Sequence, residues 1–178
     1  MRSILLKILA LSDQAVIWLG RLVAWLTLLM VVVTVLVVVL RYSFGIGWVW
    51  LQESVTWMHA TVFLLAAAYT LSRDEHVRVD IFYSRWSPRT RIIVDTAGFA
   101  LLLLPTCGWI IYTGLDYVGS SWSVREASRE TGGLPALYLL KTLIIVTPAL
   151  LSLEGLALVA RRWAHTTDGP DTHQSAGL

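Results

Sequence analysis

The sequence predicts an all-α integral membrane protein: a bundle of four transmembrane helices with both termini in the cytoplasm. Of its 178 residues, 56% are hydrophobic and 15% are charged, and the mean hydropathy is +0.67. Soluble domains carry about 25% charged residues, so charge is too scarce here to cover a soluble domain. The charged residues are also bunched between apolar runs of about 20 residues, the length that crosses a bilayer.

The first apolar run, Leu22 to Leu40, contains no charged residue and extends back to about Ile17, past Arg21. Its β-branched residues favour a strand in water, but in hydrocarbon only helices and closed barrels satisfy every backbone group. The run exceeds the apolar core of a secretory signal, about 7 to 15 residues, so we expect it to remain as the first span. The other three runs each include one or two ionisable side chains. The four expected spans are residues 17–40, 50–71, 92–117 and 134–159.

These spans form one expected membrane domain, residues 1–163. The composition of residues 164–178 is typical of a disordered tail. The two termini and the loop between spans two and three lie on one side of the membrane, and this side carries ten Lys and Arg residues. The other two loops lie on the opposite side, which carries three. By the positive-inside rule the first side, tail included, is cytoplasmic, and loops 41–49 and 118–133 face the opposite compartment.

Several function classes are excluded or disfavoured. A net charge of +2 without a basic tract gives no footprint for nucleic acid. The one cysteine, Cys107, cannot form an internal disulfide or a CxxC motif. His59 is the only histidine expected inside a span, which disfavours a haem held by two histidines. No Ser, His and Asp share a depth, so we expect no enzyme, no metal and no cofactor.

Ionisable residues inside the expected spans carry most of the information about function. Such charges cost a few kcal/mol in hydrocarbon and normally have partners. Glu53, Lys141 and Arg41 lie within roughly 10 Å of one another in depth, which leaves a Glu53–Lys141 or a Glu53–Arg41 pair open. His59 lies about 9 Å deeper than Glu53 and on a different helix face. A second layer, near the cytoplasmic interface, consists of Arg21, Asp95 and Glu154.

Three interpretations of these layers compete. Opposite charges fix the register of the helices, or Glu53, His59 and Lys141 line an ion or proton path, or the charges contact another subunit. Carriers usually have Gly- or Pro-interrupted helices in matching positions of two halves. Pro105 and Pro148 interrupt spans three and four without a Gly-rich break, so the structural interpretation is favoured.

A distinctive run from Arg73 to Tyr83 follows the second span, and its apolar and polar residues alternate. This alternation fits an extended segment or an interfacial turn, and the sequence does not decide between them. A metal site is disfavoured in this arginine-rich loop. The candidate motif residues of this loop are Arg73, Glu75, His76, Arg78 and Asp80.

Three stretches carry a resemblance to a known family: VLRYSFG at Val39–Gly45, WLQESVTWMHATVFLLAAAYTLSRDEHVRVDIFY at Trp50–Tyr83, and GGLPALYLLKTLIIVTP at Gly132–Pro148. In this order they resemble the DctQ-type small membrane (Q) subunit of tripartite ATP-independent periplasmic (TRAP) transporters. The GGLPALYLLK form is similar to the branch whose systems import 2-oxo acids and related organic anions. Family-like positions are occupied by Arg41, Glu53, Arg73, His76, Asp80 and Pro135.

The resemblance implies a four-helix scaffold in the bacterial inner membrane. Its partners would be a large multi-spanning subunit, which carries the sodium and substrate sites, and a periplasmic binding protein that delivers an organic anion. Because the chain ends soon after the fourth span, we expect the large subunit to be a separate polypeptide. Nothing in the family pattern makes the six residues at family-like positions catalytic.

Charges in the 118–133 loop are candidates for docking the binding protein, since rim charges steer encounter; the alternative is that they only solvate the loop. Two further functions are considered: an autonomous four-helix proton-coupled carrier that uses Glu53, and a membrane anchor of a redox enzyme. The candidate docking residues are Arg125, Glu126, Arg129 and Glu130.

Overall fold

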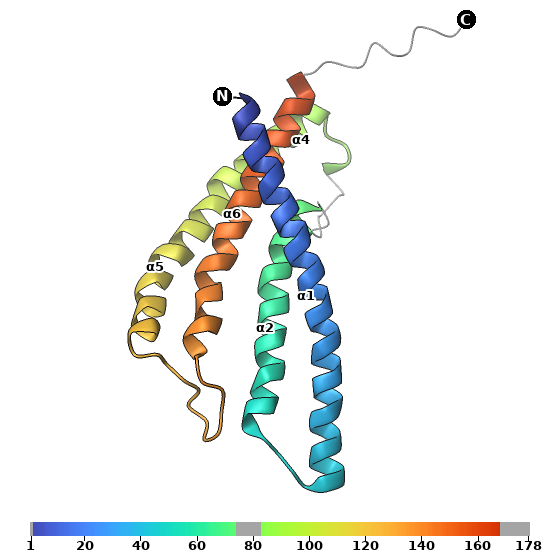
Figure 1. The fold of residues 1–178 in the computed structure, drawn as a ribbon. Helices are drawn as coiled ribbons and strands as arrows, with labels where there is room; N and C mark the ends of the chain where they lie inside the picture. Colours follow the sequence, from blue (N-terminus) through green and yellow to red (C-terminus); the bar gives the residue numbers. More distant parts are fainter. Residues whose placement is uncertain (1, 74–82, 168–178) are drawn as a thin grey trace, which may run out of the picture.

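The computed structural model describes residues 2–73 and 83–167, and this part is helical apart from turns and loops (Figure 1). Four helical segments are long and apolar enough to cross a membrane, and no strand occurs among the described residues. The predicted all-α fold with four spans is therefore confirmed. In chain order the elements are α1 (Arg2–Phe44), α2 (Val49–Ser72), α4 (Pro88–Gly98), the π-helical segment η1 (Phe99–Leu103), α5 (Leu104–Ser123) and α6 (Leu137–Thr167).

α1 is far longer than one membrane crossing requires. Its 43 residues correspond to about 64 Å of helix, roughly twice the hydrocarbon thickness, and the candidate span within it is Val16–Phe44. The hydroxyls of Thr27 and Thr34 donate to backbone carbonyls four residues earlier, at 3.5 and 2.7 Å. From Leu22 to Leu40 the other side chains are all apolar, so this stretch of α1 presents an almost entirely apolar surface. Gly45, with φ +68°, follows the helix end and supplies the left-handed conformation that side chains disfavour.

α2 packs between α1 and α6. A Cβ added to Gly20 of α1 would lie 2.4 Å from the Tyr69 ring of α2. Only a glycine therefore permits the two helices to approach this closely. The side chains that α2 buries against its neighbours are Leu51, Leu65 and Ala68.

The third span is one continuous helical path, residues 88–123, and is longer than the predicted 92–117. Its start is set by Ser87, whose Oγ accepts a hydrogen bond from the Thr90 backbone N–H at 3.2 Å. η1 immediately precedes the turn that contains Pro105. Proline has no backbone N–H, so it interrupts the regular hydrogen-bond ladder, and the local π-helical turn accommodates the break. The sequence marked Pro105 as an interruption but did not predict the π-helix.

α6 begins three residues later than predicted. Ala136 has φ +74°, which lies outside the helical region, so the helix can begin only after it, at Leu137. The helix continues through Thr167, four residues into the segment whose composition predicts disorder. Residues 168–178, the rest of that expected tail, lie outside the described part.

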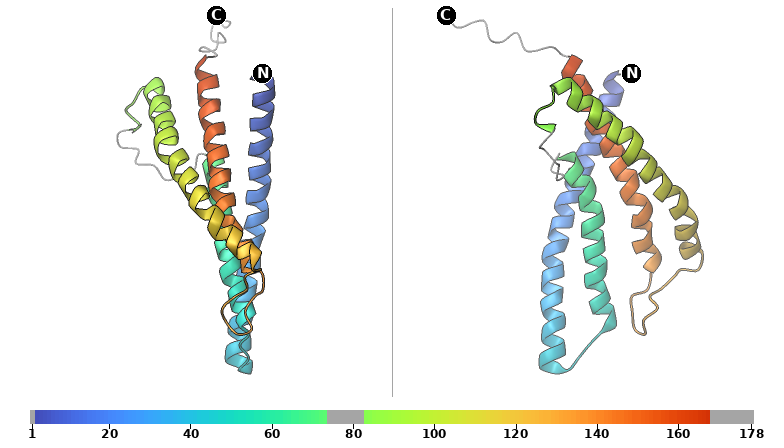
Figure 2. Two further views of the ribbon diagram at one scale, coloured as in Figure 1. Left: turned by 90° about the vertical axis from the view of Figure 1, so that its left-hand side faces the viewer. Right: turned by 180° about the vertical axis from the view of Figure 1, so that it is seen from behind.

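The four spans pack as a splayed layer rather than a closed bundle. The helix start of α1 and the end of α6 lie together, which we call the terminal end, and the 124–136 loop lies at the opposite loop end (Figure 1). Figure 2 shows the third span tilted across α6. Glycines mark two contacts with α6: a Cβ on Gly114 would lie 3.3 Å from Ile144, and one on Gly155 would lie 2.6 Å from the Phe99 ring. Which compartment each end faces stays a prediction.

Candidate functional site

Glu53, in the second turn of α2, holds the loop that joins α5 to α6. Its Oε2 accepts a hydrogen bond from the Leu134 backbone N–H at 2.6 Å, and its Oε1 accepts one from the Ser128 hydroxyl. Both carboxylate oxygens are thus engaged by residues far away in the sequence. We call Glu53, Ser128, Gly133 and Leu134 the Glu53 cluster.

The two glycines before Leu134 make this contact possible. A Cβ added to Gly133 would lie 2.5 Å from the Ser128 hydroxyl and 2.8 Å from Glu53 Oε2, so a side chain there would displace the carboxylate. Gly132 has φ +76°, in the left-handed region that glycine adopts at low cost. The conformation of the GGL segment, which the two glycines permit, therefore places the Leu134 N–H against the Glu53 carboxylate.

Lys141, in the second turn of α6, forms an ion pair with Glu126 of the same loop. Ser121 Oγ donates a second hydrogen bond to Glu126 Oε2 at 2.7 Å, and the Lys141 ammonium lies 4.1 Å from the centre of the Tyr117 ring. The hydrogen bonds from Lys141 and then from Ser121 lower the pKa of Glu126 below its usual 4.5. We call these four residues the Lys141 cluster.

Neither pair considered for Glu53 from the sequence occurs among the described residues. Glu53 contacts the loop instead of Lys141 or Arg41, while Lys141 pairs with Glu126. Arg41 is exposed in the last turn of α1. The physical reason is that the loop supplies closer partners: its N–H and hydroxyl groups reach Glu53, and its own carboxylate reaches Lys141.

The four candidate docking charges divide into two kinds. Glu126 is partly covered and held by Lys141, whereas Arg125, Arg129 and Glu130 are exposed. Arg125 follows the end of α5 with φ +48°. The Arg125 N–H donates to the Trp122 carbonyl at 3.2 Å, and the Glu126 N–H donates to the Ser121 carbonyl at 3.0 Å. This pair of bonds is a Schellman motif, in which the residue at the position of Arg125 is usually glycine.

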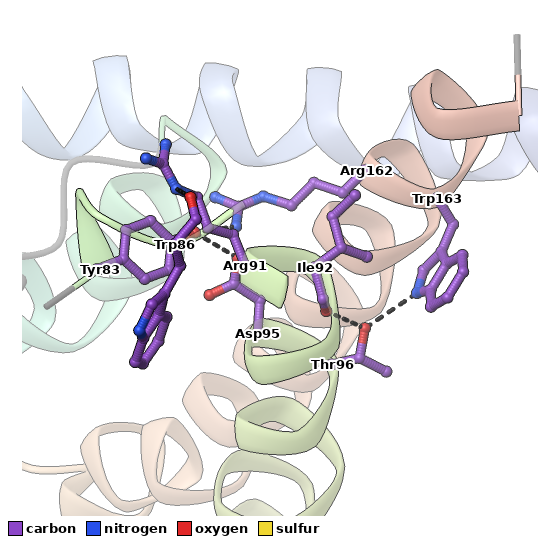
Figure 3. Close-up of polar contacts among 8 residues, drawn as sticks. All are labelled: Tyr83, Trp86, Arg91, Ile92, Asp95, Thr96, Arg162 and Trp163. Carbon is purple, nitrogen blue, oxygen red and sulfur yellow. Dashed lines mark hydrogen bonds and ion pairs between the residues drawn. The ribbon is translucent and has the colours of Figure 1, made fainter. Parts of the chain in front are cut away.

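At the terminal end, Asp95 of α4 is the centre of a second cluster (Figure 3). Arg162 of α6 forms an ion pair with its Oδ2, and the Tyr83 hydroxyl donates a hydrogen bond to the same atom at 2.7 Å. Arg162 Nη1 also donates to the Tyr83 hydroxyl oxygen at 3.0 Å. These contacts join α4, α6 and the segment before α4, and we call the three residues the Asp95 cluster.

Further contacts of α4 surround this cluster (Figure 3). Arg91 donates to the backbone carbonyls of Ser84 at 2.7 Å and Trp86 at 3.1 Å, which fixes the turn that leads into the helix. On the other side of α4, the Trp163 indole N–H donates to the Thr96 hydroxyl at 3.0 Å. α4 is thus bound both to its own preceding turn and to α6.

Glu154 of α6 is completely buried, and its carboxylate lies 3.8 Å from the Arg161 guanidinium two turns further along the same helix. The sequence placed Glu154 in one layer with Asp95 and Arg21. In the structure Asp95 and Glu154 each meet an arginine near the end of α6, while Arg21 is exposed on α1. A buried carboxylate requires such a counter-charge.

The remaining candidates do not join these clusters. His59 is exposed on α2, and its ring stacks on Phe63 with 6.5 Å between centroids. Arg73 lies over the Tyr69 ring at 5.6 Å. The other loop-motif residues, Glu75, His76, Arg78 and Asp80, lie outside the described residues.

Sequence reasoning missed the polar partners that are not charged, together with the two arginines of α6. Ser128, Tyr83 and the Leu134 N–H carry no charge, so a search for opposite charges at equal depth could not find them. The spacing of seven residues between Glu154 and Arg161, two helical turns, was a usable signal.

These features define a multi-pass membrane protein whose partly or fully buried polar groups connect helices and loops. In the part of the chain that the structure describes, no three His, Cys, Asp or Glu side chains gather as metal ligands would. A family model described as tripartite ATP-independent periplasmic transporters, DctQ component, matches residues 30–165, more than half of the chain. The chain therefore belongs to this family and is a small membrane subunit of a TRAP transporter, a transporter component and not an enzyme. None of the curated proteins compared with the chain matches it.

Proposed function

We propose that this chain is the scaffold that supports a separate large transport subunit in the inner membrane of a bacterium. In this assembly the large subunit carries out sodium-coupled uptake of organic anions, which a periplasmic binding protein delivers. One observation carries the scaffold role: the most apolar stretches of the four spans have only 6%, 11%, 6% and 28% of their residues buried within the chain. Most of the spanning surface is therefore left for lipid or for another protein.

The polar clusters suit a rigid support. The Glu53 and Lys141 clusters bind the loop end, and the Asp95 cluster binds α4 to α6 at the terminal end. Each cluster joins groups from different helices or from a helix and a loop, so each one limits how these elements can move relative to one another. Helices tied at both ends hold their mutual angles while a mobile partner moves beside them.

The geometry supports the alternative, an autonomous proton carrier, less well. Glu53 has both carboxylate oxygens engaged by the loop, and Lys141 is held by Glu126, whereas His59 is exposed on another part of α2. The three side chains that such a path would need therefore do not line a common space. A proton site must exchange its proton with water during each cycle, and a carboxylate that anchors a loop is poorly placed for this.

Docking of the binding protein is the second part of the proposal, and Arg125 supports it. An arginine in the left-handed conformation, where glycine is the common residue, carries a backbone cost of about 1 kcal/mol. Retaining such a residue fits a role for its exposed side chain. Arg129 is exposed in the same loop, so the two guanidinium groups offer a positive rim to an acidic patch on the partner.

Co-purification tests both parts. The tagged chain, expressed with its large subunit, should yield a stoichiometric complex that takes up organic anion only with a sodium gradient and the binding protein. Uptake by the chain alone in liposomes would overturn the scaffold role. In the second arm, Arg125→Glu/Arg129→Glu should leave the complex intact but weaken binding-protein association about tenfold. Arg89→Glu at the opposite end is the control, and equal effects at both ends would remove the docking role.

A further inference from the structure

The side of α2 that points away from its neighbours carries polar side chains in the middle of the span. Thr56, His59 and Phe63 are exposed there, whereas Leu65 and Ala68 are buried. Leu65 follows Thr56 by nine residues, and Ala68 follows His59 by nine, which is two and a half helical turns. The three exposed residues therefore lie opposite the packed side of the helix, and we call them the outer face of α2.

His59 lies too deep in the span for its ring to reach water. The span covers Val49–Ser72, and His59 is about 15 Å from its first residue and about 20 Å from its last. Long Lys and Arg side chains near helix ends extend to the interface, but a short imidazole at this depth cannot. The His59 ring stacks on Phe63, and no group in the described part of the chain forms a hydrogen bond with it. Such a group in hydrocarbon normally has a protein partner.

Thr56 gives a second indication. The other two threonines of α2, Thr61 and Thr70, donate their hydroxyls to the carbonyl four residues earlier, at 2.8 and 2.9 Å. The Thr56 hydroxyl makes no such bond within residues 2–73 and 83–167, and its side chain is exposed about one turn from His59. Both polar groups of the outer face are thus left for a partner outside the chain.

The outward surface of α1 shows what a lipid-facing helix of this protein looks like. Its side chains Trp25, Val32 and Val35 are each more than half exposed, and all three are apolar. Acyl chains suit such a surface, but they offer no hydrogen bond to His59 or Thr56. The surface of α1 therefore fits lipid, whereas the outer face of α2 requires protein.

We propose that the outer face of α2 packs against a transmembrane helix of the large subunit, whose side chains form hydrogen bonds with His59 and Thr56. This assignment rests on the proposed scaffold function and gives that function one face of the chain. The periplasmic binding protein, the other partner in that function, does not enter hydrocarbon. A second copy suits the face less well. A symmetric contact would bring the two His59 rings together, where one N–H···N bond leaves the other nitrogen of each ring unpaired.

Photo-crosslinking tests which molecule covers the face. Phe63 on the outer face and Trp25 on α1 are aromatic and equally exposed, at 71% and 72%. A photoreactive benzoylphenylalanine can therefore replace either one with a similar change in shape. In the complex, the probe at position 63 should crosslink to the large subunit, and the probe at position 25 should not.

Three other outcomes would overturn the assignment. Equal crosslinking to the large subunit from both positions would show no preference for the outer face. An adduct between two copies of the chain from position 63 would assign the face to self-association. Crosslinking to lipid alone from position 63, with the complex intact, would assign it to the bilayer.

Substitutions measure the strength of the contact. His59→Leu and Thr56→Val each remove hydrogen-bonding groups and should weaken the complex about threefold to tenfold. Thr34→Val is the matched control for Thr56→Val, because Thr34 is exposed on α1 but donates to its own helix at 2.7 Å. This variant should assemble as wild type does. His59→Gln keeps a donor and an acceptor and should retain more of the complex than His59→Leu.

The isolated subunit distinguishes a contact with a partner from a structural role. The removed groups have no hydrogen-bond partner within the described residues, so the thermal midpoint of each isolated variant should not fall below that of wild type. A midpoint that falls together with assembly would give the face a structural role instead. If the wild-type chain forms no complex, the scaffold function itself fails. If the complex forms and all variants assemble equally, only the assignment of the outer face fails.

Discussion

The Glu53 cluster and the Asp95 cluster each centre on one carboxylate of a span, but they hold different things. Glu53 binds a backbone N–H and a hydroxyl of a loop, whereas Asp95 binds a guanidinium and a phenol from helical neighbours. The first cluster therefore determines the shape of the 124–136 loop. The second determines how α4 lies against α6.

This difference has an energetic consequence. Removing the Glu53 carboxylate leaves donors of the loop without an acceptor, and such groups cost more than the bond itself contributed. Both members of the Asp95–Arg162 pair are 20% exposed. Water and ions can therefore replace part of what each loses, as in other partly exposed pairs. The two clusters are expected to differ in how strongly a single substitution affects them.

The largest effect is expected for Glu53→Gln. In the glutamine variant the Leu134 N–H keeps only a neutral amide oxygen as its acceptor, and the Ser128 hydroxyl must turn to accept from the amide NH₂ group. Two hydrogen bonds to a carboxylate thus become weaker bonds to a neutral group. The free energy of unfolding should fall by about 1–3 kcal/mol, and the 124–136 loop should become sensitive to protease. Thermal unfolding in detergent and limited proteolysis measure the two changes.

Glu130→Gln is the matched control, because Glu130 is exposed in the same loop and its hydrogen bonds in the described part of the chain are made by its backbone: its N–H donates to Ser128 Oγ, and its carbonyl accepts from the Gly133 N–H. This variant should behave as wild type. Protease resistance of the Glu53→Gln loop equal to that of Glu130→Gln would show that the carboxylate does not hold the loop.

The contrast also shows what the sequence could predict. The four spans were predictable because runs of about 20 apolar residues leave hydrocarbon as the only suitable environment. The helix ends were not, since they depend on local contacts. The start of α6 depends on the left-handed conformation of Ala136, and the π-helical turn depends on how the chain accommodates Pro105.

At the candidate site the sequence identified the important ionisable residues better than it identified the groups that contact them. Glu53, Asp95, Glu154 and Lys141 stood out because an ionisable group inside a span needs an explanation. Pairing opposite charges at equal depth gave the wrong partners for Glu53. Its partners are uncharged donors of a loop that folds back, and the depth of loop residues in the membrane cannot be calculated from the sequence. Distance along a helix gives depth but says nothing about a loop conformation fixed by two glycines.

A smaller effect is expected at the Asp95 cluster. A double-mutant cycle of Asp95→Asn and Arg162→Gln should give a coupling energy of about 1 kcal/mol or less. The coupling should shrink at high salt, because the pair is partly exposed. Arg89→Gln, an exposed arginine in the first turn of α4, serves as the control. A coupling as large as the Glu53→Gln effect, or one insensitive to salt, would contradict the comparison.

The smallest effect is a pH dependence from Glu126. Its pKa in the folded protein is lowered below 4.5 by the hydrogen bonds from Lys141 and then Ser121. A lowered folded pKa means that the contribution to stability is present above the unfolded value and is lost as pH falls through the folded value. The thermal midpoint of wild type should therefore exceed that of Glu126→Gln at pH 7.

The two midpoints should converge as the pH falls well below 4.5, because protonated Glu126 no longer attracts Lys141 as a carboxylate does. The variant Glu53→Gln should keep the same Glu126-dependent slope, since Glu53 does not contact Lys141 or Glu126 among the described residues. A slope that disappears in Glu53→Gln would mean that the two clusters form one cooperative unit. A midpoint difference that stays constant with pH would show that Glu126 acts by packing rather than by charge.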